Sequence, residues 1–456
     1  MKDDTETDIG APFAAASAQG ALSAAPVGWR AGAAAASSAS PQAAGGPSQP
    51  RPPHVLIIVE NLPVPFDRRV WQEAEALRDA GWRVSVVCPV GKGHDALHET
   101  LDGIEIRRHP LPQASGGRLS YLREYAHALS AQLRLAAQAH AAAPVDVIHA
   151  CNPPDLIFLV AAWRRLRSGT RFVFDHHDLC PELFQTKFAR RGRLSAVFLA
   201  VLKLCERATF ALADATIATN ETFKRLAVSR GGMNPDEVWV VKSYPRPERF
   251  RRVDPDPSRV SPGRSLVGYV GIMAEQDGVD LLVRAMAVLK DRGRDDIDCV
   301  VVGDGPALAW LRNLALKLGV EDRVDFTGYL TGDPLLATLS AVDIGVIPDP
   351  PDDFNSKLSM NKVFEYMMLG LPFVQFDLAQ ARSESRQAAL VAPEGTPEAL
   401  ADGIAELADD PERRDRMGAW GRDVAAREFR WDNEAAKLIE AHAHALAKRS
   451  RRLRGA

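Results

Sequence analysis

Residues 54–89, HVLIIVENLPVPFDRRVWQEAEALRDAGWRVSVVCP, decide the fold of this chain. They begin with the apolar run HVLIIVE and end with the apolar run WRVSVVCP, and both runs are expected to form buried β-strands. Between them, the segment from Asp67 to Ala80 places apolar side chains at helical spacing, and Gly81 ends the helix. A helix of this length between two buried strands is typical of a parallel βαβ unit.

The same alternation continues along the chain in two successive series. The first series goes on with the strand-like segments DVIHA, RFVFD and ATIAT, which helical segments separate. The Pro-rich, charged stretch SYPRPERF (residues 243–250) then interrupts the pattern. The second series has five strand-like segments: SLVGYVG, DCVVVG, RVDFTG, DIGVIPD and LPFVQFD. The sequence therefore predicts an α/β protein with two Rossmann-like, doubly wound parallel-sheet domains joined by a linker.

These patterns also predict the domain boundaries. Residues 1–53 are rich in Ala, Ser, Gly and Pro without periodicity, which predicts a disordered tail. The two α/β domains are expected at residues 54–245 and 246–430. Residues 431–456 are expected to form a C-terminal helix that packs back on the N-terminal domain and ends in a basic tail.

Composition and charge exclude several classes of protein. The chain has 456 residues and a formal net charge of -3, which gives no reason to expect a nucleic-acid partner. Its five cysteines are scattered without a CxxC pair, which argues against a disulfide framework or a zinc site and indicates a reducing cytoplasm. The first residues are acidic and polar, and no run of about 18 apolar residues occurs, so neither a secretory signal nor a transmembrane helix is expected.

Ligands of open parallel sheets bind beyond the carboxyl ends of the strands, so the loops after strands are the candidate sites. The loop after the first strand carries Asn61, and Asp67 stands at the start of the helix, followed by Arg68 and Arg69. Asp67 can be a helix cap followed by a solvated basic first turn, or these three residues can contact a substrate. Because a basic pair opposes the dipole at a helix N-terminus, an anionic ligand there would explain it.

The segment DHHDLCPEL places two adjacent histidines at the end of another predicted strand. Asp175 and Asp178 flank His176 and His177. A metal site would need further ligands at suitable spacing, and none is near in the sequence, so no metal is expected. A histidine bonded to a sugar hydroxyl or a phosphate fits better, with His177 the first candidate and His176 the second, because consecutive side chains diverge.

The second series carries glycine loops and one unusual acid. Gly271 follows a strand, and amides in such a loop can cradle a diphosphate. Gly303 and Gly305 stand in a similar loop, where close packing and contact with a base are equally good explanations. Glu365 lies in the middle of the apolar helix of SMNKVFEYMMLGLPFV, where ribose hydroxyls would satisfy a buried carboxylate; the alternative is a carboxylate that reaches solvent at the helix edge.

Two further polar residues stand at the start of the same helix. Asn361 lies one turn before Glu365 on the same helix face, and Lys362 brings a positive charge near the helix start.

Together these segments resemble family 4 of the glycosyltransferases, which are retaining enzymes of the GT-B fold that use nucleotide-sugar donors. The resemblance covers about residues 54–447 and is nearest to the bacterial subgroup that builds surface polysaccharides or lipid-linked glycans. It implies two Rossmann-like domains that face a central cleft, with the N-terminal domain on the acceptor side and the C-terminal domain binding the nucleotide sugar. The motifs that carry it are DRRVWQEAEALRDAGWRV, DVIHACNPPDL, FDHHDLCPEL, VGYVGIMAEQDGVDLL, VVVGDGP and MNKVFEYMMLGLPFVQFDL.

The resemblance also implies roles for residues. Glu365 would bind the ribose, and His177 would contact the donor sugar or its phosphate, so these two are the expected catalytic residues. The base would lie near Tyr329 and the two glycines of VVVGDGP, and the diphosphate near Gly271 and the start of the Asn361 helix. The acceptor side would comprise Asn61, Asp67, Arg68, Arg69 and His176.

Three departures from the family pattern concern the diphosphate. The position eight residues before Glu365, often a second glutamate, is Lys357. The positions of the usual basic pair are Ile272 and Asp277, and the usual Asn-Gly after the linker strand is Ser243-Tyr244. Other groups must then meet the diphosphate charge, and the candidates are Lys357, Lys362 and the helix amides.

The predicted reaction is transfer of a sugar, with retention, from a nucleoside diphosphate sugar to a glycan or polyprenyl-linked acceptor in bacterial polysaccharide biosynthesis. The nucleotide sugar is a co-substrate, and no cofactor or metal is expected. A nucleotide-sugar epimerase of GT-B fold and a non-catalytic nucleotide-sugar-binding scaffold remain alternatives. An NAD-dependent oxidoreductase is rejected, because the first loop reads ENLPVPFD in place of a glycine-rich GxGxxG.

Two basic segments favour contact with an anionic membrane surface. They are FARRGR (residues 188–193), which precedes a long apolar helix, and the C-terminal tail. Solvated surface is the alternative. The predicted location is therefore the cytoplasm or the inner face of the cell membrane, as a peripheral protein.

Overall fold

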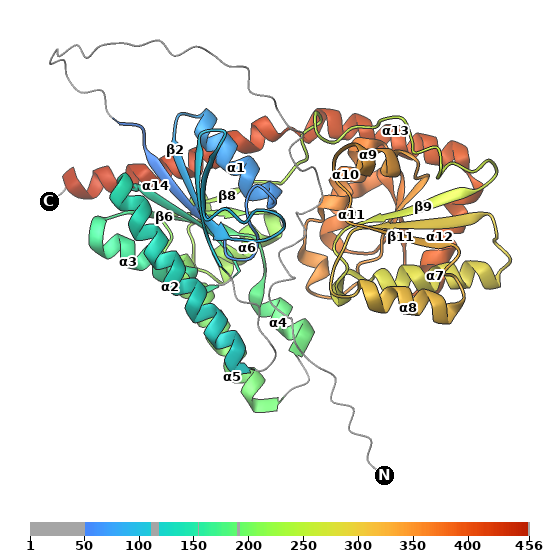
Figure 1. Cartoon of the computed structure of the whole chain (residues 1–456), viewed down its shortest axis with the longest axis horizontal. Helices are drawn as coiled ribbons and strands as arrows, with labels where there is room; N and C mark the ends of the chain where they lie inside the picture. The colour runs from blue at the N-terminus through green and yellow to red at the C-terminus, as the bar shows by residue number, and fades with distance from the viewer. Residues whose placement is uncertain (1–50, 111–117, 154, 189–191, 455–456) are drawn as a thin grey trace.

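The computed structural model describes residues 51–110, 118–153, 155–188 and 192–454. The predicted disordered tail lies outside these residues, apart from its last three. The chain forms two α/β bodies side by side, and the helix α14 (Trp431–Arg454) runs from the second body back to the first (Figure 1).

The N-terminal domain is built on an eight-stranded sheet with the order β3-β4-β2-β1-β5-β6-β7-β8. Strand β1 is parallel to β2 on one side and to β5 on the other, with Val55 opposite Val84 and Val147. This arrangement confirms the parallel βαβ unit predicted for residues 54–89. The strands are β1 (His54–Ile58), β2 (Arg83–Pro89), β3 (His98–Leu101), β4 (Ile104–His109), β5 (Val147–Cys151), β6 (Arg171–His176), β7 (Ala215–Ala218) and β8 (Val238–Val240).

Helices cover both faces of this sheet. They are α1 (Arg68–Asp79), α2 (Arg118–Ala142), η2 (Asp155–Ile157), α3 (Phe158–Ser168), α4 (Cys180–Phe188), α5 (Gly192–Leu212), α6 (Glu221–Ser229) and η3 (Pro235–Glu237). Helix α1 begins after its cap residue Asp67, whose Oδ1 accepts from the Val70 amide at 3.1 Å. Asp67 is therefore a helix cap, which was one of the two roles that the sequence left open. The predicted linker stretch, residues 243–250, lies within residues 241–264, which are all described and contain no helix or strand.

The C-terminal domain has a six-stranded sheet in the order β11-β10-β9-β12-β13-β14, and all its strands are parallel. The strands are β9 (Ser265–Val270), β10 (Ile297–Val302), β11 (Val324–Gly328), β12 (Ile344–Ile347), β13 (Phe373–Phe376) and β14 (Ala389–Ala392). The helices are η4 (Glu275–Asp277), α7 (Val279–Asp291), α8 (Leu308–Leu318), α9 (Gly332–Ser340), η5 (Asn355–Lys357), α10 (Asn361–Leu369), α11 (Ala379–Ser385), η6 (Arg386–Ala388), α12 (Pro397–Asp409) and α13 (Pro411–Glu428).

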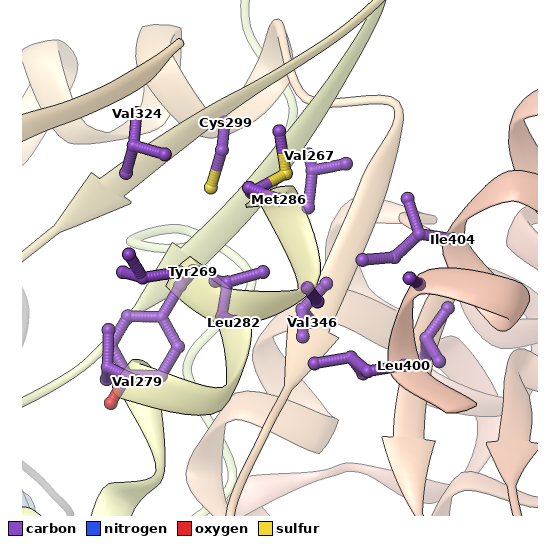
Figure 2. Close-up of a cluster of buried hydrophobic side chains, with 14 of the residues drawn as sticks. Val267, Tyr269, Val279, Leu282, Met286, Cys299, Val324, Val346, Leu400 and Ile404 are labelled. Carbon is purple, nitrogen blue, oxygen red and sulfur yellow. The ribbon is translucent and has the colours of Figure 1, made fainter. Parts of the chain in front are cut away.

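One of the two buried core clusters of this domain lies between the sheet and helices α7 and α12, and the other includes side chains of α9, α10 and α13. Figure 2 shows Leu282 and Met286 of α7 against Val267 of the sheet, with Leu400 and Ile404 of α12 beside them. These side chains are fully buried. Burying such side chains stabilises a fold by about 1.5–3 kcal/mol each before entropy is counted, so the domain is a rigid base for the loops at its sheet edge.

Helix α14 completes the N-terminal domain. Its Leu438, Ala441 and Ala445 are buried in one cluster with Val55 and Val84 of the N-terminal sheet. The chain therefore crosses between the domains twice, once in the linker and once before Trp431.

Candidate active site

Four of the predicted site residues, Asp67, Arg69, His177 and Asn361, line a pocket between the two domains, beyond the carboxyl ends of the strands. This pocket has about 60 Å³ of free volume, enough for a few water molecules but not for a nucleotide sugar. Its lining comes from both domains: Asp67, Arg69, His177, Asp178, Thr219, Phe223 and Ser243 from the N-terminal side and Leu358, Ser359, Asn361 and Phe364 from the C-terminal side. A second pocket lined from both domains, which includes Arg225, Lys242 and Phe364, has about 380 Å³ of free volume.

His177 follows strand β6 directly, and its ring is held by neighbours. Its amide donates to Asn152 Oδ1 at 2.7 Å. Its Nε2 lies 2.5 Å from Asp175 Oδ2 and 2.9 Å from Arg69 Nε. The ring borders the pocket and is 12% exposed, so His177 is both oriented and accessible.

A buried polar network lies behind His177. Arg69 Nη2 donates to Asp175 Oδ1 at 2.9 Å, and Arg69 Nε lies 3.1 Å from Glu73 Oε1. His149 Nε2 lies 3.3 Å from Asp175, and His149 Nδ1 lies 3.0 Å from His442 Nε2 on α14. The network thus joins α1, β5, β6 and the C-terminal helix underneath the site.

The protonation states in this network follow from burial and from Arg69. Burial raises the pKa of Glu73 well above its ordinary range, which indicates a neutral carboxyl group. Burial opposes ionisation of Asp175 too, but the positive charge of Arg69 and the contacts with His177 and His149 hold its pKa well below the ordinary value. Burial lowers the pKa of His149, and it lowers that of His442 to about 3. The network is therefore built around the Asp175–Arg69 ion pair, and burial disfavours the charged forms of Glu73, His149 and His442 beside it.

Two residues predicted for the acceptor side have other positions. The Arg69 guanidinium is buried in this network and also donates to the Val241 carbonyl at 3.0 Å, so its polar head faces the protein. His176 is fully buried, and its ring contacts Phe174 and Phe223. The prediction for His176 is wrong, because the last residue of β6 points into the core while the next residue reaches the cleft.

Glu365 lies in α10 and is 3% exposed, which rules out the solvent-facing alternative. Its Oε1 accepts from Arg68 Nη2 at 2.6 Å. Arg68 is the first residue of α1, so this ion pair spans the cleft. The rings of Phe66 and Tyr329 meet at 5.7 Å between centroids, a second contact between the first loop and the C-terminal domain.

The two lysines expected near the diphosphate are both paired. Lys362 Nζ lies 2.9 Å from Asp349, and it also stands 4.9 Å from the centre of the Tyr269 ring. Lys357 Nζ lies 2.6 Å from Asp353 and does not border the pocket. Asn361, in contrast, lines the pocket at the first position of α10.

The glycine loops pack backbone against backbone. A Cβ atom on Gly303 would come within 1.9 Å of the Gly271 carbonyl, and one on Gly305 within 2.4 Å of the Met273 carbonyl. A Cβ atom on Gly271 would meet the Tyr269 hydroxyl at 2.5 Å. The structure thus gives close packing as a reason for all three glycines.

The loop after Gly271 holds itself in place through Asp277 and Tyr269. Asp277 accepts from the Ala274 amide at 2.9 Å. The Tyr269 hydroxyl donates to the Ile272 carbonyl at 2.7 Å. Residues 271–278, GIMAEQDG, bring no basic side chain to the loop.

The remaining predicted residue of the first loop is Asn61. It is half-buried, and its Nδ2 is a buried donor without a hydrogen-bond partner among the described residues. Asp67 also lines the pocket, and burial raises its pKa. Burying an unpaired amide donor is unfavourable, which makes Asn61 a good candidate for ligand contact.

Two groups of side chains could each offer three ligand atoms to a metal ion. They are His149, Cys151 and Asp175, and Glu73, Asp175 and His177. Both use Asp175, which already pairs with the buried guanidinium of Arg69 at 2.9 Å. A metal ion would have to compete with that cation, so these residues fit a polar network better than a metal centre.

Asn152, Thr219 and Ser359 were not predicted as site residues from the sequence, and Ser243 was named only as a departure from the family pattern. Asn152 holds the amides of His177 and Asp178 through its Oδ1, at 2.7 and 3.2 Å. Asn152 and Thr219 stand just beyond the ends of β5 and β7. The rule that sites lie beyond carboxyl ends of strands could have found these two.

Comparison with known proteins gives this site a context. The family model described as Glycosyltransferase Family 4 matches residues 67–243, and that described as Glycosyl transferases group 1 matches residues 264–410. An alpha-D-kanosaminyltransferase of Streptomyces kanamyceticus is 30% identical over 254 residues, which cover 55% of this chain and 62% of that protein. A GDP-mannose-dependent alpha-(1-6)-phosphatidylinositol monomannoside mannosyltransferase of Mycobacterium tuberculosis is 32% identical over 247 residues, 47% of this chain and 64% of that protein. The chain thus spans about three fifths of the length of these relatives.

A solved structure extends the likeness to the whole fold. Sucrose-phosphate synthase from Thermosynechococcus elongatus superposes with a TM-score of 0.69 at 19% identity, covering 87% of this chain and all of that one. At this identity the likeness concerns the fold alone.

Proposed function

The chain belongs to glycosyltransferase family 4, and on this premise we propose that it transfers a sugar from a nucleoside diphosphate sugar to a glycan or lipid-linked acceptor, with retention, in bacterial polysaccharide biosynthesis. The observation that carries the proposal is the buried carboxylate of Glu365, which faces the cleft from an otherwise apolar helix. A carboxylate in such a place costs free energy unless donors satisfy it. In this structure Arg68 is such a donor, at 2.6 Å, and ribose hydroxyls are suitable donors when a nucleotide sugar is bound.

His177 would meet the donor sugar. Two neighbours contact its Nε2 atom: Asp175 Oδ2 lies 2.5 Å away, and the Nε–H of Arg69 donates to it at 2.9 Å. These contacts hold the ring at the border of the pocket, where it can form a hydrogen bond with a sugar hydroxyl.

Amides at the start of α10 would receive the diphosphate. The cap residue of this helix is Met360, which has no side-chain hydrogen bond to the first turn. Helix N-termini attract anions through such amides and the helix dipole. Asn361 stands at the same place and lines the pocket.

Thermal shift with a panel of UDP-, GDP- and ADP-sugars tests the donor class. One of these donors should raise the melting temperature of the wild type by mass action. Glu365→Ala should abolish that shift, whereas Glu321→Ala, at an exposed position outside the cleft, should retain it. A shift of equal size in Glu365→Ala would contradict the assigned role.

The products of the reaction distinguish the transferase from the two alternatives, an epimerase and a non-catalytic scaffold. An epimerase would release a free sugar isomer without an acceptor, and a scaffold would bind the donor without turnover. Acceptor-dependent formation of the nucleoside diphosphate supports the transferase.

We also propose a peripheral position at an anionic membrane surface, because α5 carries an exposed apolar stripe. Val197, Val201 and Leu204 are 62%, 49% and 67% exposed and follow one helix face. Lys203 and Arg207 are exposed beside this stripe. An apolar stripe with flanking cations is typical of helices that lie on lipid headgroups.

Flotation with liposomes that contain anionic lipid tests this position. Wild-type protein should float at low salt, and Val201→Glu with Leu204→Glu should not. Leu316→Glu, at an exposed apolar position of α8, is the matched control and should float. Wild-type protein that stays at the bottom of the gradient would contradict the proposal.

Across the described residues, no helix is long and apolar enough to cross a bilayer.

A further inference from the structure

The ion pair between Arg68 and Glu365 occupies the place that the proposed function gives to the ribose. Its two atoms are 2.6 Å apart, and the partners come from opposite sides of the cleft. Glu365 can accept ribose hydroxyls only if Arg68 moves aside or shares it. A ribose that takes the place of Arg68 would release this guanidinium inside the cleft.

The C-terminal domain, meanwhile, offers little positive charge for a diphosphate. The loop of residues 271–278 contains no Lys or Arg. The charge of Lys362 is matched by Asp349 at 2.9 Å, and that of Lys357 by Asp353 at 2.6 Å. The pyrophosphate of a nucleotide sugar is dianionic at neutral pH, so helix amides alone would leave much of its charge uncompensated.

We propose that Arg68 binds the diphosphate of the donor and that its pair with Glu365 is the resting position of the same side chain. The proposal rests on the proposed function of Glu365. The ribose 5′ carbon carries the first phosphate, so a guanidinium displaced from the ribose needs only a side-chain rotation to reach the phosphate oxygens. Its planar fork can then donate two parallel hydrogen bonds.

The backbone around Arg68 is fixed, which leaves the side chain as the moving part. Asp67 caps α1 through the Val70 amide, and Arg69 is anchored on Asp175 at 2.9 Å. Arg68 itself is 22% exposed and is the least enclosed of the three. The Phe66–Tyr329 contact places the same loop against the C-terminal domain, so the Arg68 side chain lies in the cleft.

In this arrangement Arg68 exchanges one anion for another. Without a donor it neutralises the buried Glu365. With a donor it neutralises the diphosphate, while ribose hydroxyls take its place on Glu365. The exchange should favour complete nucleotides over nucleosides, because a nucleoside displaces the cation without offering it a new partner.

Calorimetric titration tests this exchange with uridine, guanosine, adenosine and their diphosphates as probes. Arg68→Ala and the uncharged near-isostere Arg68→Gln should bind the matching diphosphate at least about tenfold more weakly, as expected for loss of one charge-assisted hydrogen-bonding pair. Their affinity for the nucleoside should stay equal to that of the wild type or increase. Arg78→Ala, at the exposed end of the same helix, is the control and should change neither affinity.

Three other results would overturn the proposal. Unchanged diphosphate affinity in both Arg68 variants would show that this residue does not bind the phosphates. An equal loss for nucleoside and diphosphate would make it a structural residue of the cleft. A wild type that binds none of the diphosphates would contradict the proposed function first, and this proposal with it.

Discussion

Nδ1 of His149 lies 3.0 Å from Nε2 of His442, and this contact joins strand β5 to the C-terminal helix beneath the candidate site. His149 in turn lies 3.3 Å from Asp175, the carboxylate that orients His177. The helix that returns from the second domain is therefore part of the support of the site. Its removal would affect the N-terminal domain first.

Leu438→Ala should destabilise the N-terminal domain by about 2–5 kcal/mol, because it leaves a cavity in a fully buried position. Urea unfolding measured by circular dichroism checks the value. Leu316→Ala, at a 60% exposed position of α8, should change the free energy of unfolding by less than about 0.5 kcal/mol. Equal effects of the two substitutions would contradict the packing of α14 on the first domain.

Two carboxyl groups of the buried network should respond differently to amide substitution. Glu73→Gln should change the free energy of unfolding by less than about 1 kcal/mol, because burial already keeps Glu73 neutral. Asp175→Asn should cost about 3–5 kcal/mol, because it leaves the buried Arg69 charge without its partner. Chemical denaturation of both variants measures the difference, and similar costs would contradict the protonation states.

Asp175→Asn should also slow the reaction, because it frees the ring of His177. A small misplacement of a positioning group lowers rates by about 100-fold. We expect this loss in kcat, with less change in donor affinity, and His177→Asn should not add to it. Additive losses in the double variant would show that the two residues act independently.

His176 should make stability depend on pH. Burial and the nearby Arg230 lower its pKa from 6.5 to about 3 in the folded protein. Between these values the unfolded state binds a proton that the folded state does not, so stability falls as pH falls, by up to about 1.4 kcal/mol per pH unit. Urea titrations from pH 7.5 to pH 4.5 should show a shallower decline in His176→Phe than in wild type. An equal slope in wild type and His176→Phe would contradict the lowered pKa. The control is His127→Phe, at an exposed position, and its stability should depend on pH as that of wild type does.

Gly303→Ala should impair folding far more than Gly293→Ala. Both glycines have positive φ, 139° and 74°, which strains any other residue. A new Cβ on Gly303 would also meet the Gly271 carbonyl at 1.9 Å, whereas one on Gly293 has no atom within 4 Å. Yields of folded protein and melting temperatures compare them, and equal losses would contradict the close packing of these loops.

Much of the fold followed from local patterns in the sequence. The βαβ unit of residues 54–89, the cap at Asp67 and the helix that carries Glu365 all appear where apolar spacing and cap residues place them. The β3–β4 hairpin was not predicted. Strand β3 reads HETL, and its residues alternate between exposed and half-exposed positions without an apolar run. A short polar strand at a sheet edge gives no apolar run by which to recognise it.

The site was predictable in outline but not in its contacts. The loops that follow strands contain Asn61, His177 and Gly271, and strand ends could be located from the sequence. The partners could not, because His149 and His442 are 293 positions apart and Arg68 and Glu365 are 297 apart. The packing of α14 on the N-terminal domain brings the first pair together, and the docking of the two domains brings the second pair together. No local spacing in the sequence predicts either contact. Successive side chains of a strand point to opposite faces. Strand β6 ends at His176, whose side chain points into the core, so the next residue, His177, reaches the cleft.

Turnover of the donor identified by thermal shift tests the central claim most directly. Phosphorus NMR would follow that nucleoside diphosphate sugar with a lipid-linked glycan extract as acceptor, for wild type and Glu365→Gln. We predict acceptor-dependent release of the nucleoside diphosphate by the wild type and at least about a 100-fold slower release by the variant, a loss of about 2.7 kcal/mol in transition-state stabilisation. Release at the same rate by both proteins, or none by the wild type, would contradict the account.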